Sequence, residues 1–486
     1  MTEKRPGRFQ RAWRKVLVAA MVLAVVAPFW LVYRMGTRRS AAIAAAGRDD
    51  PNWRLDDLLA HREAVADADN GAIPVAEAAA KLPDPWPPAP TPQQAAGGLA
   101  LQEAFDRATK AEGPERPDDE TLAVLRAELA ARGDALAVAR EVARFARGRS
   151  ELVVPPNVLE TKYEAAHAAR RVARLLQADA IVAACDGRPD DALASCRAML
   201  GVGRAIGDQP GLIPQLVRGA VDRSAVHTIL ATLAWGEPSA DALAKAQRDV
   251  LAALAAPIER YALRGERALS FAMFERATAD PNVFRGEKDD GEPVSRILLP
   301  IWAPFMAWQQ VLVLESSNEL AAIVERPTPE WLAVVEAWRA RMKAREASRV
   351  GRITGLFALL LAPTSDSAFD AWMSRRAYLG AAAVLLAAER QRLATGEWPA
   401  TVAEIDSEIL PDPPRDPYTG GPFRMRLADG RLRVYSLGTN LKDEGGDYDL
   451  KAWRDKIGRD DVGACAFAPE LRGRPAVAND PDDPER

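Results

Sequence analysis

Histidine and cysteine are scarce in this chain of 486 residues, which contains three of each. So few histidines leave little room for a histidine-rich metal site. Cys185 and Cys196 flank one predicted turn. Their offsets from that turn differ by more than one helical turn, so their Cα atoms are expected to lie too far apart for a disulfide. We therefore predict small buried thiols.

Aromatic residues make up only 6% of the chain. Together with abundant alanine, this favours helices over strands. The 64 Lys and Arg are nearly balanced by 68 Asp and Glu, for a net charge of −4. That balance excludes a generally basic nucleic-acid-binding protein, so no nucleic-acid partner is expected. A hydrophobic fraction of 48% excludes disorder over the whole chain.

One apolar run is long enough to span a membrane. Residues 16–33 (VLVAAMVLAVVAPFWLVY) carry no charge. As a helix they would measure about 27 Å, close to the ~30 Å hydrocarbon core of a bilayer. Six Lys and Arg precede the run and three follow it. This difference predicts a single-pass protein of the inner (cytoplasmic) membrane, with residues 1–15 as a cytoplasmic basic segment and the bulk extracytoplasmic.

A cleaved signal peptide is the alternative interpretation of this run. The apolar stretch is longer than the usual core of a signal peptide, and Arg34, Arg38 and Arg39 separate it from the small residues 41–46. Both features favour an uncleaved anchor. The apolar stretches 297–314 and 355–362 are interrupted or too short and are predicted to be core helices. An interfacial role remains open for three aromatic residues of the first stretch: Trp302, Phe305 and Trp308.

Residues 34–117 are predicted to be a linker that includes a short helical stretch, 55–65, and a proline-rich segment, 82–92. Residues 118–365 are predicted to be an α-helical domain that starts at an Asp118 or Asp119 cap. Within it, the turn 187–190 joins two helices, and Ser239 caps a later one. The pairs resemble tetratricopeptide-type hairpins, although no sustained 34-residue period supports a repeat array.

The charges of this domain predict solvated or structural roles. Alternating Arg and Glu through 259–276 predict a solvent-exposed helix face with salt bridges. In the turn 187–190, Asp190 is expected to cap the next helix. Glu164 and His167 have the spacing of a helical di-iron ligand pair, but the second pair and further carboxylates are missing. His227, in an apolar helix, is expected to be half-buried and hydrogen-bonded.

Residues 366–455 are predicted to form a small α+β module. A helix over 371–394 ends at Gly396 and is followed by two alternating segments, 423–427 and 431–437. Asp429-Gly430 between them is the dipeptide preferred in a tight β-hairpin turn. Residues 456–486 are assigned to a partly disordered tail. The predicted fold class is therefore mainly α, with an N-terminal transmembrane helix, an array of helical hairpins and a C-terminal long helix plus antiparallel hairpin.

The C-terminal motifs GEWP, DPYTGGPFRMR, DGRLRVYSLGTN and DEGGDYD occur in this order over residues 372–450. This order resembles the C-terminal part of the major pseudopilins of type II secretion, and of uncharacterised membrane-anchored bacterial proteins that carry such a module. The resemblance implies a calcium ion in the acidic loop. Its ligands would be Leu437 (main-chain oxygen), Asn440, Asp443, Asp447 and Asp449. The alternative is a solvated acidic turn.

Unlike pseudopilins, this chain has no glutamate in its apolar run, and more than 300 residues separate the run from the module. A pilus-forming subunit is therefore not expected. Familiar metal, nucleophile and phosphate motifs are absent from the sequence. The leading hypothesis is a membrane-anchored structural or protein-interaction protein, related to the envelope or to secretion, that binds protein partners of unknown identity. The alternative is an extracytoplasmic hydrolase with a carboxylate-based site in the helical domain.

Overall fold

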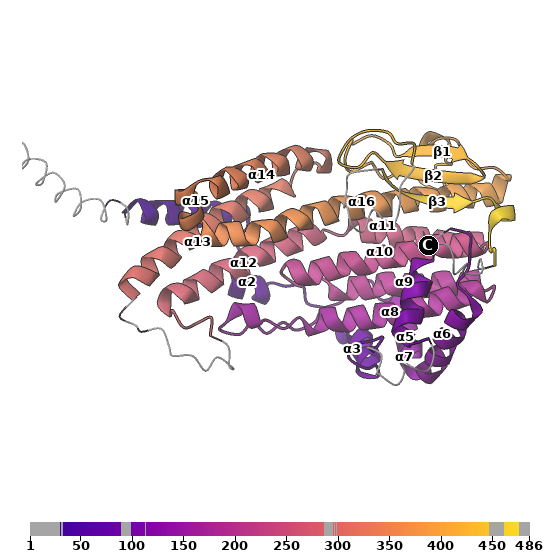
Figure 1. The fold of residues 1–486 in the computed structure, drawn as a ribbon, viewed down its shortest axis with the longest axis horizontal. Coiled ribbons are helices and arrows are strands. Elements are labelled where there is room, and N and C mark those ends of the chain that lie inside the picture. Colours follow the sequence, from indigo (N-terminus) through magenta and orange to yellow (C-terminus); the bar gives the residue numbers. More distant parts are fainter. Residues whose placement is uncertain are drawn as a thin grey trace, which may run out of the picture.

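The computed structural model describes residues 30, 33–88, 99–111, 113–285, 295, 297, 299–446 and 461–475. It is mainly helical, with one three-stranded antiparallel sheet near the C-terminus (Figure 1). This confirms the coarse prediction of fold class. The expected cytoplasmic segment 1–15 and nearly all of the expected span 16–33 lie outside the described residues. In the part of the chain that the structure covers, no helix is both long and apolar enough to cross a membrane.

The centre of the molecule is a set of consecutive helices that pack as hairpins: α8 (Glu164–Cys185), α9 (Pro189–Ile206), α10 (Leu212–Trp235), α11 (Ala240–Ala255) and α12 (Ile258–Ala279). Ser239 caps α11 as predicted, because its Oγ accepts the backbone N–H of Ala242 at 3.2 Å. The prediction that Asp190 caps α9 is wrong. Pro189 begins that helix, and the Asp190 carboxylate instead accepts the N–H of Ser239 at 2.8 Å. Asp190 therefore ties the two hairpins together.

A second group of helices lies along this centre: α13 (Leu299–Ile323), α14 (Trp331–Ala347), α15 (Arg349–Thr354) and α16 (Leu356–Thr395). The predicted domain boundary at 365/366 falls inside the single helix α16 and is wrong. Helix α16 packs against α10, α11 and α13, which precede that boundary, and against strands of the sheet, which follow it. Its buried residues join the main hydrophobic core, so the helical part and the C-terminal module share one interior.

The sheet consists of β1 (Arg424–Ala428), β2 (Arg431–Ser436) and β3 (Val462–Phe467), in the order β1-β2-β3. The predicted hairpin turn is confirmed, because Asp429 and Gly430 have φ angles of 54° and 65°. The sheet packs on α16, where the ring of Phe423 lies against Gly380. A Cβ at Gly380 would lie 2.5 Å from Phe423 Cζ, so this close approach requires glycine.

The third strand corrects the assignment of residues 456–486 to a partly disordered tail. β3 pairs with β2 along its whole length and is almost entirely buried. Arg472, just after β3, donates to Glu389 of α16 at 2.6 Å, and both side chains are buried. The module therefore contains a three-stranded sheet, and its third strand comes from residues that were predicted to lie outside the module.

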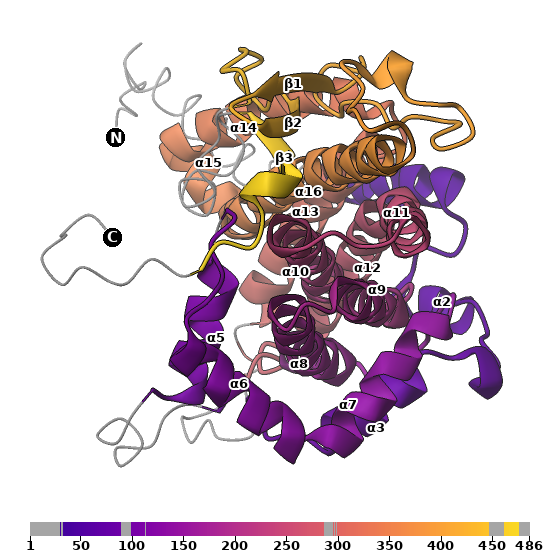
Figure 2. The same ribbon diagram turned by 90° about the vertical axis from the view of Figure 1, so that its right-hand side faces the viewer.

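The assignment of residues 34–117 to a linker is also wrong for its described part. Residues 33–49 are helical. They are followed by helices that pack on the centre: α2 (Leu55–Ala60), α3 (Ala72–Ala80) and α5 (Leu101–Lys110). Two further helices, α6 (Asp119–Ala131) and α7 (Gly133–Glu141), complete this layer, and Asp118 caps α6 as predicted. An end-on view shows α8, α9 and α10 enclosed between this layer and the side that carries α16 and the sheet (Figure 2).

In the described parts of the chain, short 3-10 helices connect the longer elements: η1 (Asp67–Asp69), η2 (Val142–Arg144), η3 (Val158–Glu160), η5 (Thr328–Glu330), η6 (Val402–Glu404) and η7 (Pro469–Leu471). The cysteines Cys185 and Cys196 are free and buried, as the sequence predicts.

Only some of the charges of α12 form the solvent-exposed face with salt bridges predicted for 259–276: Arg260 and Glu275 are exposed and paired, whereas others are buried. Glu259 is 1% exposed and accepts two hydrogen bonds from Arg376 of α16. Arg267 is 3% exposed and pairs with Asp50 at 2.8 Å. The partners lie far away in the sequence, so the local charge pattern could not reveal that these groups are buried. They fasten α12 to its neighbours.

Candidate functional site

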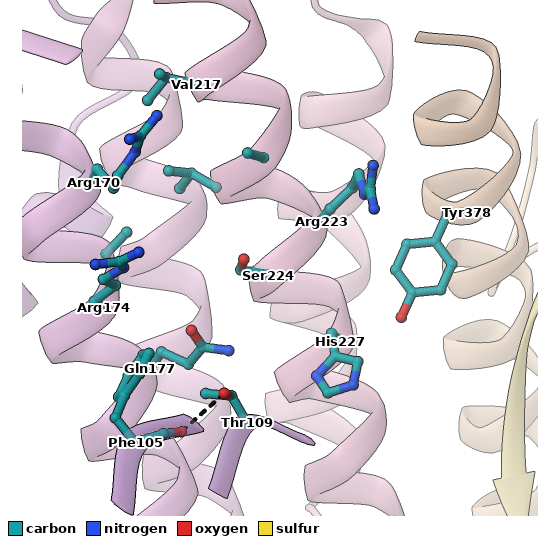
Figure 3. Close-up of a pocket in the computed structure, with 13 residues that line it drawn as sticks. Phe105, Thr109, Arg170, Arg174, Gln177, Val217, Arg223, Ser224, His227 and Tyr378 are labelled. Atoms are coloured by element: carbon teal, nitrogen blue, oxygen red, sulfur yellow. Dashed lines mark hydrogen bonds between the residues drawn. The ribbon is translucent and has the colours of Figure 1, made fainter. Parts of the chain in front are cut away.

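An arginine-lined pocket of about 410 Å³ opens between α8 and α10 (Figure 3). Arg170 and Arg174 extend from α8, and Arg223 extends from α10. Helix α5 contributes Phe105 and Thr109 to one side, while Tyr378 of α16 lies on the other. None of the described residues that line the pocket is acidic. We call this hollow the arginine pocket.

Helical periodicity explains why these side chains meet. Positions 170, 173, 174 and 177 lie on one face of α8, and positions 217, 221 and 224 lie on one face of α10. Positions 220, 223 and 227 form the adjacent face of α10, which carries Arg223. Each helix also contributes a small residue, Ala173 on α8 and Ala220 on α10. Small residues between long ones leave a hollow whose rim is formed by guanidinium groups.

The arginine pocket is electropositive. Burial lowers the pKa of Arg174, and the neighbouring charge of Arg170 lowers it further, while Asp106 of α5 acts in the opposite direction. Arg174 also donates to the carbonyl oxygen of Trp86 at 3.3 Å. Two like charges held side by side are relieved by an anion placed between them. The pocket is therefore arranged to bind a negatively charged group.

Neutral polar groups of the pocket add hydrogen-bonding capacity. Ser224 of α10 lies between Arg170 and Arg174 on one side and Arg223 and Tyr378 on the other, and His227 lies on the side of Arg223 (Figure 3). His227 is half-buried, as predicted. Gln177 of α8 donates to the hydroxyl of Thr228 at 3.2 Å, which fixes the spacing of the two helices beneath the pocket. The pocket floor is thus held in place by a buried hydrogen bond.

A second pocket, of about 360 Å³, is mostly apolar and contains one carboxyl group, that of Glu266 on α12. Burial raises the pKa of Glu266, although the backbone N–H of Leu212 donates to it and opposes the shift. Tyr163 lines the same pocket. Burial raises the pKa of Tyr163 to about 12, and the charge of Glu266 makes a smaller contribution in the same direction. All described lining residues lie between 158 and 361, within the range 118–365 in which the hydrolase hypothesis expects its site. We call this the Glu266 pocket.

The structure places the five expected calcium ligands as follows. Leu437 is buried at the end of β2, and the Asn440 side chain donates to Glu444 at 2.9 Å. Asp443 accepts from Arg424 at 2.7 Å and from the hydroxyl of Tyr435 at 3.0 Å. Asp447 and Asp449 lie outside the described residues. Within the described ranges, no three His, Cys, Asp or Glu side chains are grouped closely enough to hold a metal ion.

The same loop contains a carboxylate that the sequence did not single out. Asp461, directly before β3, is 2% exposed, and one of its oxygens accepts the N–H groups of Glu444 and Gly446 at 3.1 and 2.8 Å. Its other oxygen, Oδ1, has no hydrogen-bond partner in the described structure. Burial raises the pKa of Asp461 to about 6, and the charges of Glu444 and Asp443 contribute in the same direction. Asp461 closes the loop against the sheet.

Glu164 and His167 are both exposed at the start of α8, on the helix that carries Arg170 and Arg174. The structure does not bring them to either pocket. The arginine pocket was missed because its cationic residues lie up to 53 positions apart, Arg170 to Arg223, on helices whose relative rotation the sequence does not define. The usable signal was the spacing of Arg170, Arg174 and Gln177 on one helix face.

Comparison of the chain with protein-family models, with curated proteins and with solved structures finds no match.

Proposed function

We propose that this protein is a single-pass membrane protein whose extracytoplasmic body binds an acidic segment of a protein partner in the arginine pocket. The observation that carries the proposal is that Arg170, Arg174 and Arg223 line one pocket whose described lining contains no carboxylate. Such a site suits the capture of an anion more than catalysis by acidic residues. The protein is accordingly a binding component and not an enzyme in this proposal.

The chemistry of the pocket favours carboxylate or phosphate groups. Guanidinium groups bind these anions through paired N–H donors, and hydrogen bonds to charged groups are stronger than neutral ones. Three arginines on two helices can contact more than one anionic group at once. Ser224 and Tyr378 offer hydroxyl groups to the same ligand. An acidic peptide segment, with several carboxylates in a row, fits this arrangement.

A peptide titration tests the proposal. Full-length protein in detergent is titrated with a hexaglutamate peptide, and binding is measured by calorimetry. We expect binding that weakens as salt is added, and a loss of at least about tenfold in affinity, on the order of 1.4 kcal/mol, in the variant Arg170→Gln/Arg223→Gln. Arg144→Gln, at an exposed arginine outside the pocket, is the matched control. Equal affinity of wild type and double variant would refute the proposal.

The Glu266 pocket favours a second candidate function, an extracytoplasmic hydrolase. A carboxyl group whose pKa is raised by burial in an apolar pocket keeps its proton to a higher pH than a free glutamate and can act as a general acid. In this case full-length protein would cleave a p-nitrophenyl ester faster than buffer does, and Glu266→Gln would lose that rate. If the wild type and Glu266→Gln cleave the ester at the same rate, the hydrolase function is refuted and only the binding function remains.

Calcium binding by the acidic loop is part of the proposal. It is supported by Asp461, whose buried Oδ1 has no hydrogen-bond partner among the described residues. The described carboxylates do not form a metal site by themselves, so the ligands would have to include Asp447 and Asp449. Millimolar calcium is expected to raise the thermal unfolding temperature of the full-length protein, and to raise it less in Asp461→Asn. No change in the wild type would remove calcium from the proposal. The link to secretion rests on the resemblance of residues 372–450 to pseudopilins.

A further inference from the structure

Exposed apolar side chains gather at one end of the molecule. This end is formed by the start of α13, the start of α16 and the helix that begins the described chain (Figure 1). Its most exposed large apolar side chains, with their exposed fractions, are Ile297 (81%), Ile301 (76%), Tyr33 (72%), Leu360 (61%), Trp30 (55%) and Leu356 (44%). We call these six residues the apolar end. Single exposed apolar residues are common on proteins, but a group of them at one place marks a contact surface.

Packing beneath the surface shows that these residues share one end. The indole N–H of Trp302 on α13 donates to the carbonyl oxygen of Ala277 near the end of α12, at 2.6 Å. One turn earlier, the ring of Phe274 packs edge-to-face on Phe357 of α16, with 5.2 Å between ring centroids. The first turns of α13 and α16 are therefore joined through the last turns of α12, and their outer side chains face the same surroundings.

The helix of residues 33–49 is held along the middle and second half of α13. Arg38 pairs with Glu315 of α13 at 2.5 Å, and Arg39 donates to Gln310 at 2.8 Å. Asn318 donates to the carbonyl oxygen of Ala42 at 3.0 Å. The expected membrane span, residues 16–33, leads directly into this helix. The chain thus enters the body at the apolar end, and the connection is held by side chains of α13.

Basic residues border the apolar end. Residues 343–352 contain four basic residues and one acidic residue, and they lead directly into α16 and Leu356. Arg345 lies close to Gly355, since a Cβ on that glycine would be 2.7 Å from the Arg345 Cδ. On the other side, the exposed Arg34 lies over the ring of Trp30, 4.9 Å from its centroid. Apolar, aromatic and basic groups together match the boundary between lipid tails and anionic headgroups.

We propose that the apolar end lies on the membrane, with Ile301 and Leu360 among the lipid headgroups and tails and residues 343–352 against anionic headgroups. The occupant of this surface is the lipid bilayer. This inference rests on the proposed membrane anchor and adds to it a fixed orientation, because the body would rest on the bilayer instead of swinging on a flexible tether. The sheet, at the other end of the long axis, would then point away from the membrane (Figure 1).

Depth-dependent fluorescence on the full-length protein tests this proposal. Cys465→Ser removes the one cysteine that is not buried. In this background Ile301→Cys and Leu360→Cys are labelled with an environment-sensitive dye and reconstituted into vesicles of phosphatidylcholine and phosphatidylglycerol. Leu427→Cys on β1 is the matched control, because Leu427 is 58% exposed at the far end. We expect brominated lipids to quench the dyes at positions 301 and 360 severalfold, and to leave the dye at 427 unchanged.

The outcomes separate the orientation from the anchor. If the wild-type protein fails to float with the vesicles, the anchor itself is refuted. If it floats and the dyes at 301 and 360 are unquenched, the anchor stands and the orientation is overturned. Unquenched dyes whose blue-shifted emission disappears on dilution would assign the surface to a second copy of the chain. Arg349→Gln/Arg352→Gln is expected to reduce quenching in vesicles that contain phosphatidylglycerol, but not in pure phosphatidylcholine.

Discussion

Arg375 and Asp222 form an ion pair in which each side chain is only 1% exposed. The guanidinium of Arg375 donates to one oxygen of Asp222 at 3.1 and 2.6 Å and to the carbonyl oxygen of Ala253 at 2.7 Å. Arg218, also buried, lies near Asp222. Removing one partner of a buried pair leaves the other charge without compensation, which costs more than the intact pair gains.

We therefore expect Asp222→Ala to lower the free energy of unfolding by about 3–5 kcal/mol. Urea denaturation of the full-length protein in detergent measures this change. The double variant Asp222→Leu/Arg375→Met is expected to recover only part of the loss, because buried Arg218 would still lack the charge of Asp222. A loss below about 1 kcal/mol in Asp222→Ala, the range of exposed pairs, would show that water reaches this site.

Asp461 gives the stability of the protein a pH dependence. An unfolded aspartate loses its proton near pH ~4, whereas burial keeps Asp461 protonated in the folded protein up to a pKa of about 6. The folded state then binds more protons than the unfolded state between these pH values. The free energy of unfolding consequently falls as the pH rises from about 4 to 6 and stays lower above that range.

Asp461→Asn is expected to remove this fall, because an amide oxygen can still accept the two loop N–H groups and cannot ionise. In urea denaturation the two proteins should be equally stable below pH ~4, and the variant should be more stable by about 1–3 kcal/mol above pH ~6. Asp429→Asn, at the exposed turn, serves as the control. A difference between Asp461→Asn and wild type that is the same at both pH values would contradict the assignment.

At the scale of elements, local chemistry was enough for helices and for the hairpin. Asp429-Gly430 and the alternation of apolar residues predict β1 and β2, and Ser239 and Asp118 mark helix starts. The third strand was missed because Val462–Phe467 contains mostly small residues, which give a weak strand signal. Its place is fixed by pairing with β2 and by burial against α16.

Contacts between distant segments explain the other differences between prediction and structure. Residues 33–49 look like a linker in sequence, and their packing depends on Glu315 and Gln310 of α13. The buried charges of α12 depend on Asp50 and on Arg376 of α16. The arginine pocket has the same origin, since it exists only when α8 and α10 lie side by side. A sequence pattern shows which residues share one face of a single helix. To predict a site between two helices, one must also know how the helices are rotated relative to each other, which the sequence pattern does not show.

The whole molecule combines a proposed anchor with a body that is fixed to it. Because the helix of residues 33–49 is held to α13, the direction in which the chain leaves the membrane sets the direction of the long axis. The arginine pocket is lined by α5, α8 and α10. Of these, α5 lies toward the end of the molecule that carries the sheet (Figure 1). An extracytoplasmic body would therefore present the pocket away from the bilayer, where a soluble segment of a partner could reach it.

Reporter fusions test this topology. We expect alkaline phosphatase fused after Arg486 to be active, because the enzyme folds only outside the cytoplasm, and a fluorescent protein that needs the cytoplasm to be dark at the same position. The physical cause is the difference between six basic residues before the apolar run and three after it. Replacing Lys4, Arg5, Arg8 and Arg11 by Gln leaves two before and three after. This variant should shift signal from phosphatase to fluorescence.

Fractionation of the phosphatase fusion distinguishes an uncleaved anchor from the alternative, a cleaved signal peptide. Both would give an active phosphatase, but only an uncleaved anchor keeps the active fusion in the membrane fraction after washing with carbonate. Release of active fusion by carbonate would mean that the apolar run had been removed, and the orientation proposed for the apolar end would lose its tether. A fluorescent fusion in the wild type would reverse the topology, and the arginine pocket would then have to recruit its acidic partner from the cytoplasm.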